Sequence, residues 1–425
     1  MKKLKHLKRL SAIKTNAGVK FLTPAAFPGN HCPLHTTLGL SSNIKGMSTL
    51  VVGTSECGTY SRNLISQSKN KDGELHWMYI LDSNEVVFGC RKGVIQAIKD
   101  MDKAGAKSIM IILTCVPEVI GEDIEGIVHE IQLDIKAKLT FVLVGHFKCN
   151  SYPSGYWKTL LAFGNLMEKS QASSNIVNVL GRSPEEEHIP MPELLTALEK
   201  RGFQLRMLAP KSDIKDFIES PNAILNLVIS PFMNPMAEMM QNKYQIPFIS
   251  LHEFYDVCEI NSLYESVAEK LCISWDNEFD EVRQEAIELQ NQVKNIFSGV
   301  NYISTHVGAL DPLPLVLYLD QFNMNPILLH LDEFYPDDRK WAKVINEKGH
   351  NPMICHMVND DADIHVLNDI CIGFSFGELL KGKSQVPCIP YLYNLYGQIG
   401  YERTKLLLSG MLNAFSNKTF GIKEV

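Results

Sequence analysis

Ten cysteines are the residues of this 425-residue sequence with the widest range of possible chemistry. A thiolate can bind soft metals or attack electrophiles, and two thiols can join as a disulfide. Residues 1–10 are basic, but no apolar core or small-residue cleavage site follows them, so they do not form a secretory signal. We therefore expect a cytoplasmic, reducing compartment in which the cysteines are buried thiols, metal ligands or nucleophiles.

Three cysteines stand where α/β proteins often place ligands. Cys57 follows the expected strand 49–52, and Cys115 comes directly after the expected strand 109–113. Cys32 lies in a loop rich in Pro and Gly before the first strand. Their separations of 25 and 58 residues exclude a zinc ribbon or a Cys-x-x-Cys redox pair. Three dispersed thiolates that converge would suit an iron–sulfur cluster; the alternative is that the three side chains simply pack.

Short β-branched runs alternate with helix-length segments along the whole sequence, which is typical of parallel α/β sheets. The expected strands are 49–52, 77–81, 109–113, 141–144, 176–180, 204–208, 224–229, 247–250, 302–304, 326–331, 352–356 and 370–373. The expected helices include 91–103, 118–136, 192–201, 278–296 and 397–415. Together with the length, this pattern predicts three doubly wound, Rossmann-like α/β domains at residues 1–172, 173–298 and 299–425.

Composition and charge exclude several classes of protein. The sequence is 45% hydrophobic and 21% charged with a net charge of -7, which is ordinary globular composition. Every apolar run is too short to cross a membrane, and the mild acidity argues against nucleic acid. We expect the basic residues 1–10 to be a solvated arm or to pack on a partner subunit. No Walker phosphate loop, dinucleotide fingerprint or Ser-His-Asp arrangement occurs, so we expect no ATP site in this chain.

Four motifs in the first third of the sequence resemble the nitrogenase component 1 family. They are CPLH at 32–35, ECGTYSR at 56–62, VVFGCRKG at 86–93 and TCVPEVIGEDI at 114–124, in family order and at similar separations. The family contains nitrogenase α and β subunits, cofactor-assembly scaffolds and dark-operative protochlorophyllide reductase. The rest of the sequence resembles it mainly as a three-domain α/β pattern.

The resemblance implies a ligand set and two partners. In the family, the cysteines that correspond to Cys32, Cys57 and Cys115 bind an iron–sulfur cluster, of [4Fe–4S] or P-cluster type, where two homologous subunits meet. It therefore implies a second component 1 subunit in an α2β2-like assembly and a homodimeric ATP-binding iron protein that donates electrons. Cys90 stands where the family usually has Gly, so it is a possible additional metal ligand; otherwise it is a small residue at a tight turn.

The sequence also departs from catalytic nitrogenase α subunits. The cofactor-binding cysteine of those subunits falls near Ile229 and Ser230, and no histidine follows Val386 and Pro387 closely. The resemblance therefore implies a nitrogenase-like oxidoreductase subunit that passes low-potential electrons through the cluster to a substrate or cofactor. The alternative is a scaffold that assembles and transfers a metal cluster. No catalytic residue is assigned.

The remaining candidates are less specific. Cys149 and Cys388 remain open between a ligand role and simple packing. His31 and His35 flank Cys32 and would either donate to cluster sulfurs or lie at the surface. The loop with His146, Lys148 and Cys149 is expected to contact a substrate or partner, or to pack. The other cysteines are expected to be packed thiols: Cys258, Cys272, Cys355 and Cys371.

Overall fold

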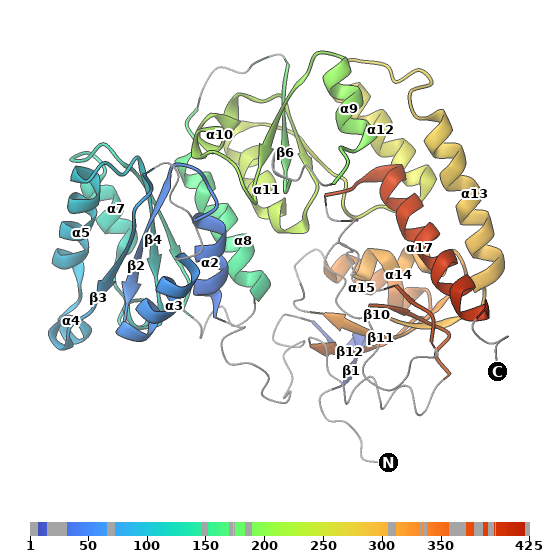
Figure 1. Ribbon diagram of the computed structural model, residues 1–425, viewed down its shortest axis with the longest axis horizontal. Helices are drawn as coiled ribbons and strands as arrows, with labels where there is room; N and C mark the ends of the chain where they lie inside the picture. The colour runs from blue at the N-terminus through green and yellow to red at the C-terminus, as the bar shows by residue number, and fades with distance from the viewer. Residues whose placement is uncertain are drawn as a thin grey trace. The chain divides into compact units, whose positions relative to one another are not determined.

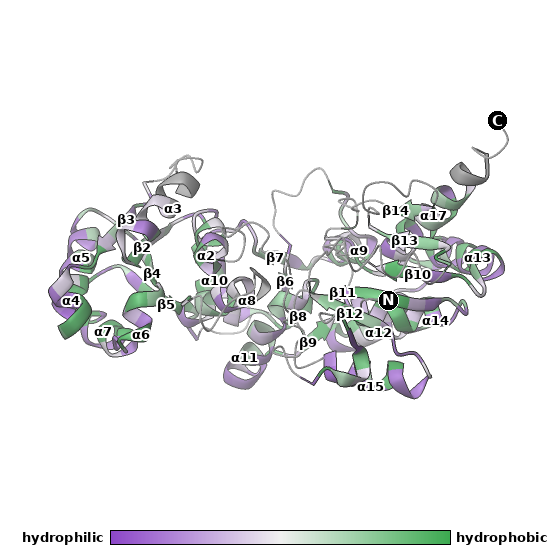
Figure 2. Cartoon of the chain, turned by 90° about the horizontal axis from the view of Figure 1, so that it is seen from below, coloured by the Kyte–Doolittle hydropathy of each residue, from purple (hydrophilic) through white to green (hydrophobic). Residues whose placement is uncertain are grey.

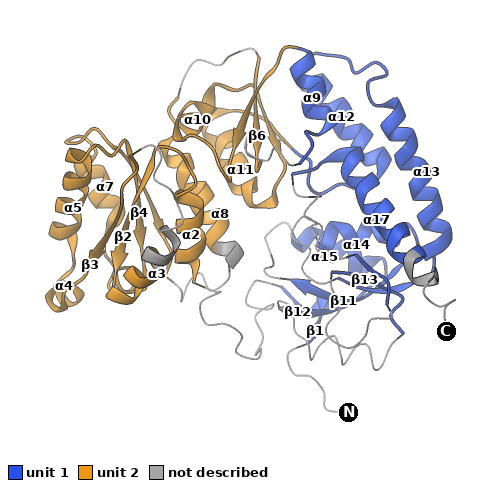
Figure 3. Cartoon of the chain, in the orientation of Figure 1, with its two compact units in different colours: residues 1–26, 187–201, 250–425 blue, residues 27–186, 202–249 orange. Residues whose placement is uncertain are grey.

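Runs of apolar and β-branched residues form the strands of three separate sheets (Figure 1). The protein is represented by a computed structural model, which describes residues 7–14, 32–65, 73–145, 152–169, 173, 175–182, 189–304, 312–331, 334, 338–356, 371–377, 386–389, 395 and 397–420. Two compact units divide the chain (Figure 3): unit 2 consists of residues 27–186 and 202–249, and unit 1 of residues 1–26, 187–201 and 250–425.

The first sheet lies in unit 2 and has the order β3-β2-β4-β5, with all strands parallel. Its strands are β2 (Met47–Gly53), β3 (His76–Ile80), β4 (Ser108–Leu113) and β5 (Lys138–Leu143). Its helices are α2 (Pro33–Ser41), α3 (Ser55–Ile65), α4 (Ser83–Phe88), α5 (Arg91–Lys103), α6 (Cys115–Val119), α7 (Ile124–Ile131) and α8 (Tyr152–Phe163). After β2 the chain adds β3 on one side of β2, and it then adds β4 and β5 on the other side. The strand order therefore reverses between β2 and β4. Sheets of this kind bind ligands at such a topological switch point.

Alternate residues of these strands face two apolar layers. Val51 and Ile112 belong to the layer that contains residues of α2 and α8. Val52 and Leu113 belong to the opposite layer, with residues of α5 and α7. Because β2 and β4 are buried along their whole length, both faces of the sheet are covered, which explains their unbroken apolar sequences.

The second sheet also belongs to unit 2 and has the same kind of strand order, β7-β6-β8-β9. Its strands are β6 (Ile176–Leu180), β7 (Gln204–Leu208), β8 (Leu225–Val228) and β9 (Phe248–Ser250), with helices α10 (Ile214–Glu219) and α11 (Asn234–Tyr244). Residues of β6 and β8 share one apolar core with β2, β4, α2 and α8. This shared core is the physical reason that the first two sheets form one compact unit.

The third sheet lies in unit 1 and has the order β1-β12-β11-β10-β13-β14. Its strands are β1 (Lys8–Arg9), β10 (Asn301–Ser304), β11 (Asn325–Leu331), β12 (Met353–His356), β13 (Phe374–Phe376) and β14 (Cys388–Ile389). Unit 1 also holds α9 (Glu193–Lys200), α12 (Val257–Leu271), α13 (Asp280–Phe297), α14 (Pro312–Asp320), α15 (Asp338–Glu347) and α17 (Gly400–Phe420). Among the described helices, none has the length and apolar composition that crossing a bilayer requires.

The expected α/β class with doubly wound parallel sheets is confirmed. Two local expectations were wrong. The single helix 118–136 is two helices, α6 and α7, because Gly121 adopts φ +80° and Asp123 caps a new helix by accepting the N–H of Gly126. The strand expected at 370–373 begins at Phe374 instead. The domain boundaries at 172/173 and 298/299 stay a prediction.

The basic N-terminal segment was also interpreted wrongly in its described part. Lys8 and Arg9 form an edge strand antiparallel to β12, opposite Ile354 and Met353. Leu10 follows and is buried in the core of unit 1. Two residues are too few for a strand to be recognised from the sequence. Only the pairing with β12 shows that this segment belongs to the third sheet.

Candidate functional site

The switch point of the first sheet brings Cys57 and Cys115 to one edge. Val52 of β2 and Leu113 of β4 are partners in the parallel ladder, so both strands end together. Cys57 lies in the first turn of α3, which follows β2, and Cys115 is the first residue of α6, which follows β4. The expected strand-end positions are therefore correct, although Cys57 is helical and α6 starts before Pro117 rather than at it.

Cys32 reaches the same region at the start of a helix that the sequence did not indicate. It is the N-cap residue of α2, with Pro33 as the first helical residue. Helix α2 packs against both α3 and α8. In the contact with α8, a Cβ atom on Gly155 would lie 3.0 Å from Cβ of Pro33. The absence of a side chain on Gly155 thus lets α8 approach the residue next to Cys32.

The surroundings of Cys32 place the other two thiols within electrostatic range of it. Burial is the largest cause that raises the pKa of Cys32, and the negative charges of Cys115 and Cys57 raise it further. The backbone N–H groups of Leu34 and His35 oppose these effects, although neither makes a capping hydrogen bond of ordinary geometry. Three thiolates gathered here would repel one another, and a bound cation would remove that repulsion.

The donor set consists of three thiols, the type of ligand that iron–sulfur clusters use. Within the described residues, no group of three or more His, Cys, Asp or Glu side chains is arranged to hold one metal ion. The three half-buried cysteines are nevertheless within electrostatic range of one another. An iron–sulfur cluster places its own iron and sulfide atoms between the ligands, so it accepts thiolates that lie too far apart for one ion.

Small residues around the cysteines keep this edge of the sheet closely packed. A Cβ on Gly53 would lie 2.1 Å from Oγ1 of Thr114, and that hydroxyl donates to the carbonyl of Val52 at 2.8 Å. The hydroxyl of Thr54 donates to Sγ of Cys57 at 3.9 Å. These residues were not predicted from the sequence, although a Gly-Thr pair at a strand end is a usable signal. Gly58, by contrast, has room for a Cβ at 3.6 Å from Met78.

Cys90 lies elsewhere. It is fully buried in the apolar layer under α5, on the face of the sheet opposite the layer against which Cys32 and Cys57 pack. Burial first, and then hydrogen bonding to Glu122, raises the pKa of Cys90 to about 12. A neutral, buried thiol of this kind favours packing over a ligand role.

The other candidates are placed as follows. Burial lowers the pKa of His35, which favours the neutral imidazole. Cys388 is half-buried on β14 of unit 1, and Cys355 is buried as expected. The expectation that three further cysteines pack was wrong, because they are exposed: Cys258, Cys272 and Cys371. His31, His146, Lys148 and Cys149 lie outside the described residues.

Exposed apolar side chains gather at the edge that carries the cysteines. They come from the carboxyl end of β3, from α4, which follows β3, and from the end of α6, which follows β4. The exposed fraction is 85% for Phe88, 71% for Val87 and 65% for Val119. We call this set the apolar rim: Ile80, Val86, Val87, Phe88, Val119 and Ile120. Figure 2 shows the hydrophobic end of α4 in green.

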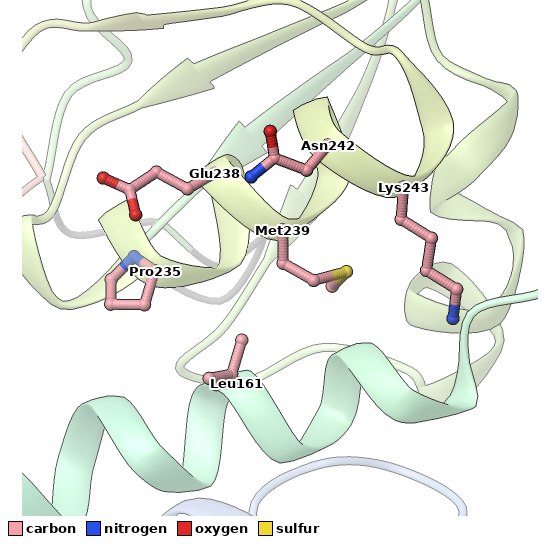
Figure 4. Close-up of a pocket in the computed structure, with 6 residues that line it drawn as sticks. All are labelled: Leu161, Pro235, Glu238, Met239, Asn242 and Lys243. Atoms are coloured by element: carbon pink, nitrogen blue, oxygen red, sulfur yellow. The ribbon is translucent and has the colours of Figure 1, made fainter.

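A separate pocket lies between α8 and α11 in unit 2 (Figure 4). Its walls combine apolar and charged side chains, with Leu161 on α8 facing Met239 on α11. Glu238 and Lys243 also line it, whereas none of the candidate cysteines does. This pocket is therefore distinct from the cysteine site.

Comparison with known proteins identifies the family. Residues 32–416 match the model of a family described as nitrogenase component 1 type oxidoreductase. The chain is 21% identical over 415 residues to the nitrogenase molybdenum-iron protein beta chain of Methanothermobacter thermautotrophicus, covering 87% of each chain. It is 24% identical over 189 residues to one of the subunits of the light-independent protochlorophyllide reductase from a Picosynechococcus strain. That match spans 40% of this chain and only 37% of the length of the reductase polypeptide.

Solved structures show the same fold. Nitrogenase Cp1 at pH 6.5 superimposes with a TM-score of 0.68 at 15% identity, covering 94% of this chain and 96% of that one. Nitrogenase Cp1 at pH 5 gives a TM-score of 0.60 at 17% identity, with coverages of 99% and 95%. Since the family model spans most of the sequence, the chain belongs to the nitrogenase component 1 type oxidoreductase family.

Proposed function

We propose that the chain is one subunit of a nitrogenase-like reductase and that Cys32, Cys57 and Cys115 hold its iron–sulfur cluster. The observation that carries the proposal is the convergence of three thiols from α2, α3 and α6 at the switch point of the first sheet. Separate segments supply the three thiols, so their meeting is a property of the fold and not of local spacing.

The surroundings of the cysteines would control the cluster. When bound, an iron–sulfur cluster supplies a one-electron relay at low potential, with the potential set by burial and by hydrogen bonds to sulfur. Here Thr54 donates to Sγ of Cys57, and the N–H groups of Leu34 and His35 stabilise negative charge on the sulfur of Cys32. These donors offset the cost of gathering thiolates in a half-buried place.

Two partners complete the proposed assembly. Three cysteine ligands leave a four-iron cluster one ligand short, so the fourth ligand would come from a homologous subunit. Relatives that match this chain over most of its length include nitrogenase molybdenum-iron protein beta chains from two organisms, which supports a β-like place for this chain. Nitrogenase-like systems deliver electrons through an ATP-binding iron protein, and no phosphate loop occurs in this sequence.

The apolar rim supports a docking place for that iron protein. Exposed apolar side chains that lie together mark interaction sites on many proteins, and the six rim residues are each exposed by more than a third. The rim lies at the edge of the sheet that carries Cys57 and Cys115. A protein that docks there would bring its own cluster near the cysteines, which electron transfer requires.

A scaffold that assembles and transfers a cluster is the second candidate. It is favoured by Ser230, which directly follows Ile229 after β8 where catalytic α subunits would place a cysteine. A Cβ on Gly181 would lie 2.5 Å from Cβ of Ser230, so the space beside Ser230 is filled by the chain itself. A scaffold would transfer its cluster to an apo-acceptor, whereas a reductase would turn over a substrate with its iron protein.

Anaerobic purification with the partner subunit tests the proposal. The wild-type complex should contain iron and show a broad visible absorption, and Cys57→Ala and Cys115→Ala should lose most of both. Cys272→Ala is the matched control, because Cys272 is exposed in unit 1. Retention of iron and absorption in both site variants would refute the cluster assignment.

A further inference from the structure

Helix α4 carries the most exposed part of the apolar rim and yet has no core of its own. It has six residues, and none of them is buried. An isolated helix of this length is unstable in water. Contacts at its two ends must therefore hold Val87 and Phe88 in place.

The first end of α4 is tied to β3. Asp82 accepts the N–H groups of Asn84 and Glu85, and the carboxylate of Glu85 accepts the N–H of Asp82 at 3.0 Å. The same carboxylate accepts the hydroxyl hydrogen of Tyr79, a β3 residue. A Cβ on Gly93 of α5 would collide with this hydroxyl, so α5 closes over the pair.

The second end of α4 is held by one carboxylate from another segment. The chain turns at Gly89 with φ +89°, and the next N–H, that of Cys90, donates to Oε2 of Glu122 at 2.7 Å. Burial first, and then interaction with Glu122, raises the pKa of the Cys90 thiol. The hydrogen bond to Oε2 of Glu122 therefore comes from the residue two places after Phe88.

Glu122 is itself fixed to the segment that carries Cys115. Its N–H donates to the carbonyl of Pro117 in α6 at 3.0 Å, and its carbonyl accepts the N–H of Ile124 at the start of α7. Helix α6 begins with Cys115 and leads into the rim residues Val119 and Ile120. Glu122 thus connects the two halves of the apolar rim across different loops.

We propose that Glu122 is a positioning residue that holds the α4 tip in register with the Cys115 segment, so that an electron donor meets a preformed rim. The inference rests on the proposed function in taking the rim as the docking surface of the iron protein. Glu122 contacts neither donor nor cluster in this view; it acts through Cys90 and Gly89. A preformed surface lowers the entropy that docking must overcome, and this favours a low KM for the donor.

Four variants separate this role from a general effect on folding. Glu122→Ala removes the carboxylate that accepts the N–H of Cys90, whereas Glu122→Gln keeps an oxygen for this N–H. Cys90→Ala keeps that hydrogen bond and removes only the neighbouring thiol. Glu130→Ala is the matched control, because Glu130 is an exposed carboxylate that pairs with Arg91 on the helices behind the rim.

Hydrogen–deuterium exchange of the assembled complex measures the position of α4 directly. In Glu122→Ala, amides of residues 83–90 should exchange about tenfold faster or more, as expected when a hydrogen bond to a charged group is lost. Amides of β2 and β4 should not change. Glu122→Gln and Cys90→Ala should give smaller increases, and Glu130→Ala should give none. If Glu122→Ala does not assemble, the two milder variants provide the same comparison.

Steady-state kinetics with the ATP-dependent iron protein as donor provide the second readout. Glu122→Ala should raise the KM for the iron protein about tenfold, with kcat at saturating donor and the visible spectrum unchanged. If Glu122→Ala leaves amide exchange in residues 83–90 unchanged, the inference is wrong, whatever the KM for the iron protein. If Phe88→Ala raises this KM but Glu122→Ala does not, the positioning role is wrong while the docking proposal stands. If neither Phe88→Ala nor Glu122→Ala changes the KM for the iron protein, the rim is not the docking surface and the docking proposal is wrong.

Discussion

The hydroxyl groups of Thr37 on α2 and Thr159 on α8 lie 2.8 Å apart in a buried contact. Thr159 also donates to the carbonyl of Gly155 one turn earlier, where α8 touches Pro33. These contacts fix the helix that begins at Cys32 against a neighbour far away in sequence. The position of the first cysteine therefore depends on helix packing and not on its own loop.

Gly155→Ala should displace the start of α2. The new Cβ would lie 3.0 Å from Cβ and 3.1 Å from Cα of Pro33, and backbone cannot move aside cheaply. We expect a loss of about 1–3 kcal/mol in the free energy of unfolding and a reduced iron content of the anaerobic complex. Thermal unfolding and iron analysis would measure both.

Gly39→Ala, in the middle of α2, is the control for Gly155→Ala. Apart from the adjacent residues and the backbone of the helix itself, no atom lies within 4 Å of a Cβ built there, so the substitution should stabilise the helix by about 0.5–1 kcal/mol. The two substitutions are therefore expected to have opposite signs. A stability for Gly155→Ala equal to that of the wild type would contradict the close α2–α8 contact.

Gly53→Ala should disrupt the junction between β2 and β4. The Cβ would overlap Oγ1 of Thr114 at 2.1 Å and force that side chain to leave its hydrogen bond with Val52. We expect a destabilisation of about 1–3 kcal/mol, measured by chemical denaturation. Adding Thr114→Ala should restore part of the loss, because the overlapping hydroxyl is gone. A double variant no more stable than Gly53→Ala would show that the strain lies elsewhere.

Phe88→Ala should weaken donor docking without changing the cysteine site. The side chain of Phe88 is 85% exposed, so its loss should leave stability within about 0.5 kcal/mol and leave the visible spectrum unchanged. The KM for the iron protein should rise about tenfold, the usual size for an aromatic interface residue.

Leu133→Ala is the matched control for Phe88→Ala. Leu133 is 92% exposed, but it lies between α7 and β5, at the edge of the sheet opposite the rim. Its substitution should leave the KM for the donor unchanged. Equal effects of the two substitutions would argue against a specific docking place on the rim.

Glu402 should make the stability of unit 1 depend on pH. Burial is the largest cause that raises the pKa of Glu402, to about 7. One carboxylate oxygen accepts the N–H of Glu193, while Oε2 is buried without a hydrogen bond in the described part of the chain. A raised carboxyl pKa means that the folded state binds the proton more tightly than the unfolded state does. Stability should therefore fall as pH rises from about 4.5 to about 7, by up to about 3 kcal/mol.

Glu402→Gln tests this assignment, because Gln keeps an oxygen for the N–H of Glu193 but does not titrate. The melting temperature of the variant should change less between pH 5 and pH 8 than that of the wild type. The difference should be largest near neutral pH, where the wild-type carboxylate is buried and charged. If the melting temperatures of the two proteins change equally with pH across this range, Glu402 is not the group responsible.

Much of the fold could be predicted from local sequence. Strands such as β2 and β4 were located because a strand covered on both faces needs an unbroken apolar run, and that run is visible in the residues. The placement of Cys57 and Cys115 at strand ends followed from the same pattern. The break at Gly121 was missed, although a glycine followed by the helix-capping Asp123 marks it.

The sequence by itself determined the α/β class, the positions of most strands and the strand-end cysteines, since these depend on residue types over a few neighbouring positions. Only the tertiary structure showed how the segments that carry the cysteines pack. Helix α2, which follows Cys32, is held by α8. Cys90 lies in the opposite apolar layer, and its N–H donates to Glu122 from another loop. Both outcomes depend on contacts between residues more than 30 positions apart, and local sequence patterns carry no information about such contacts.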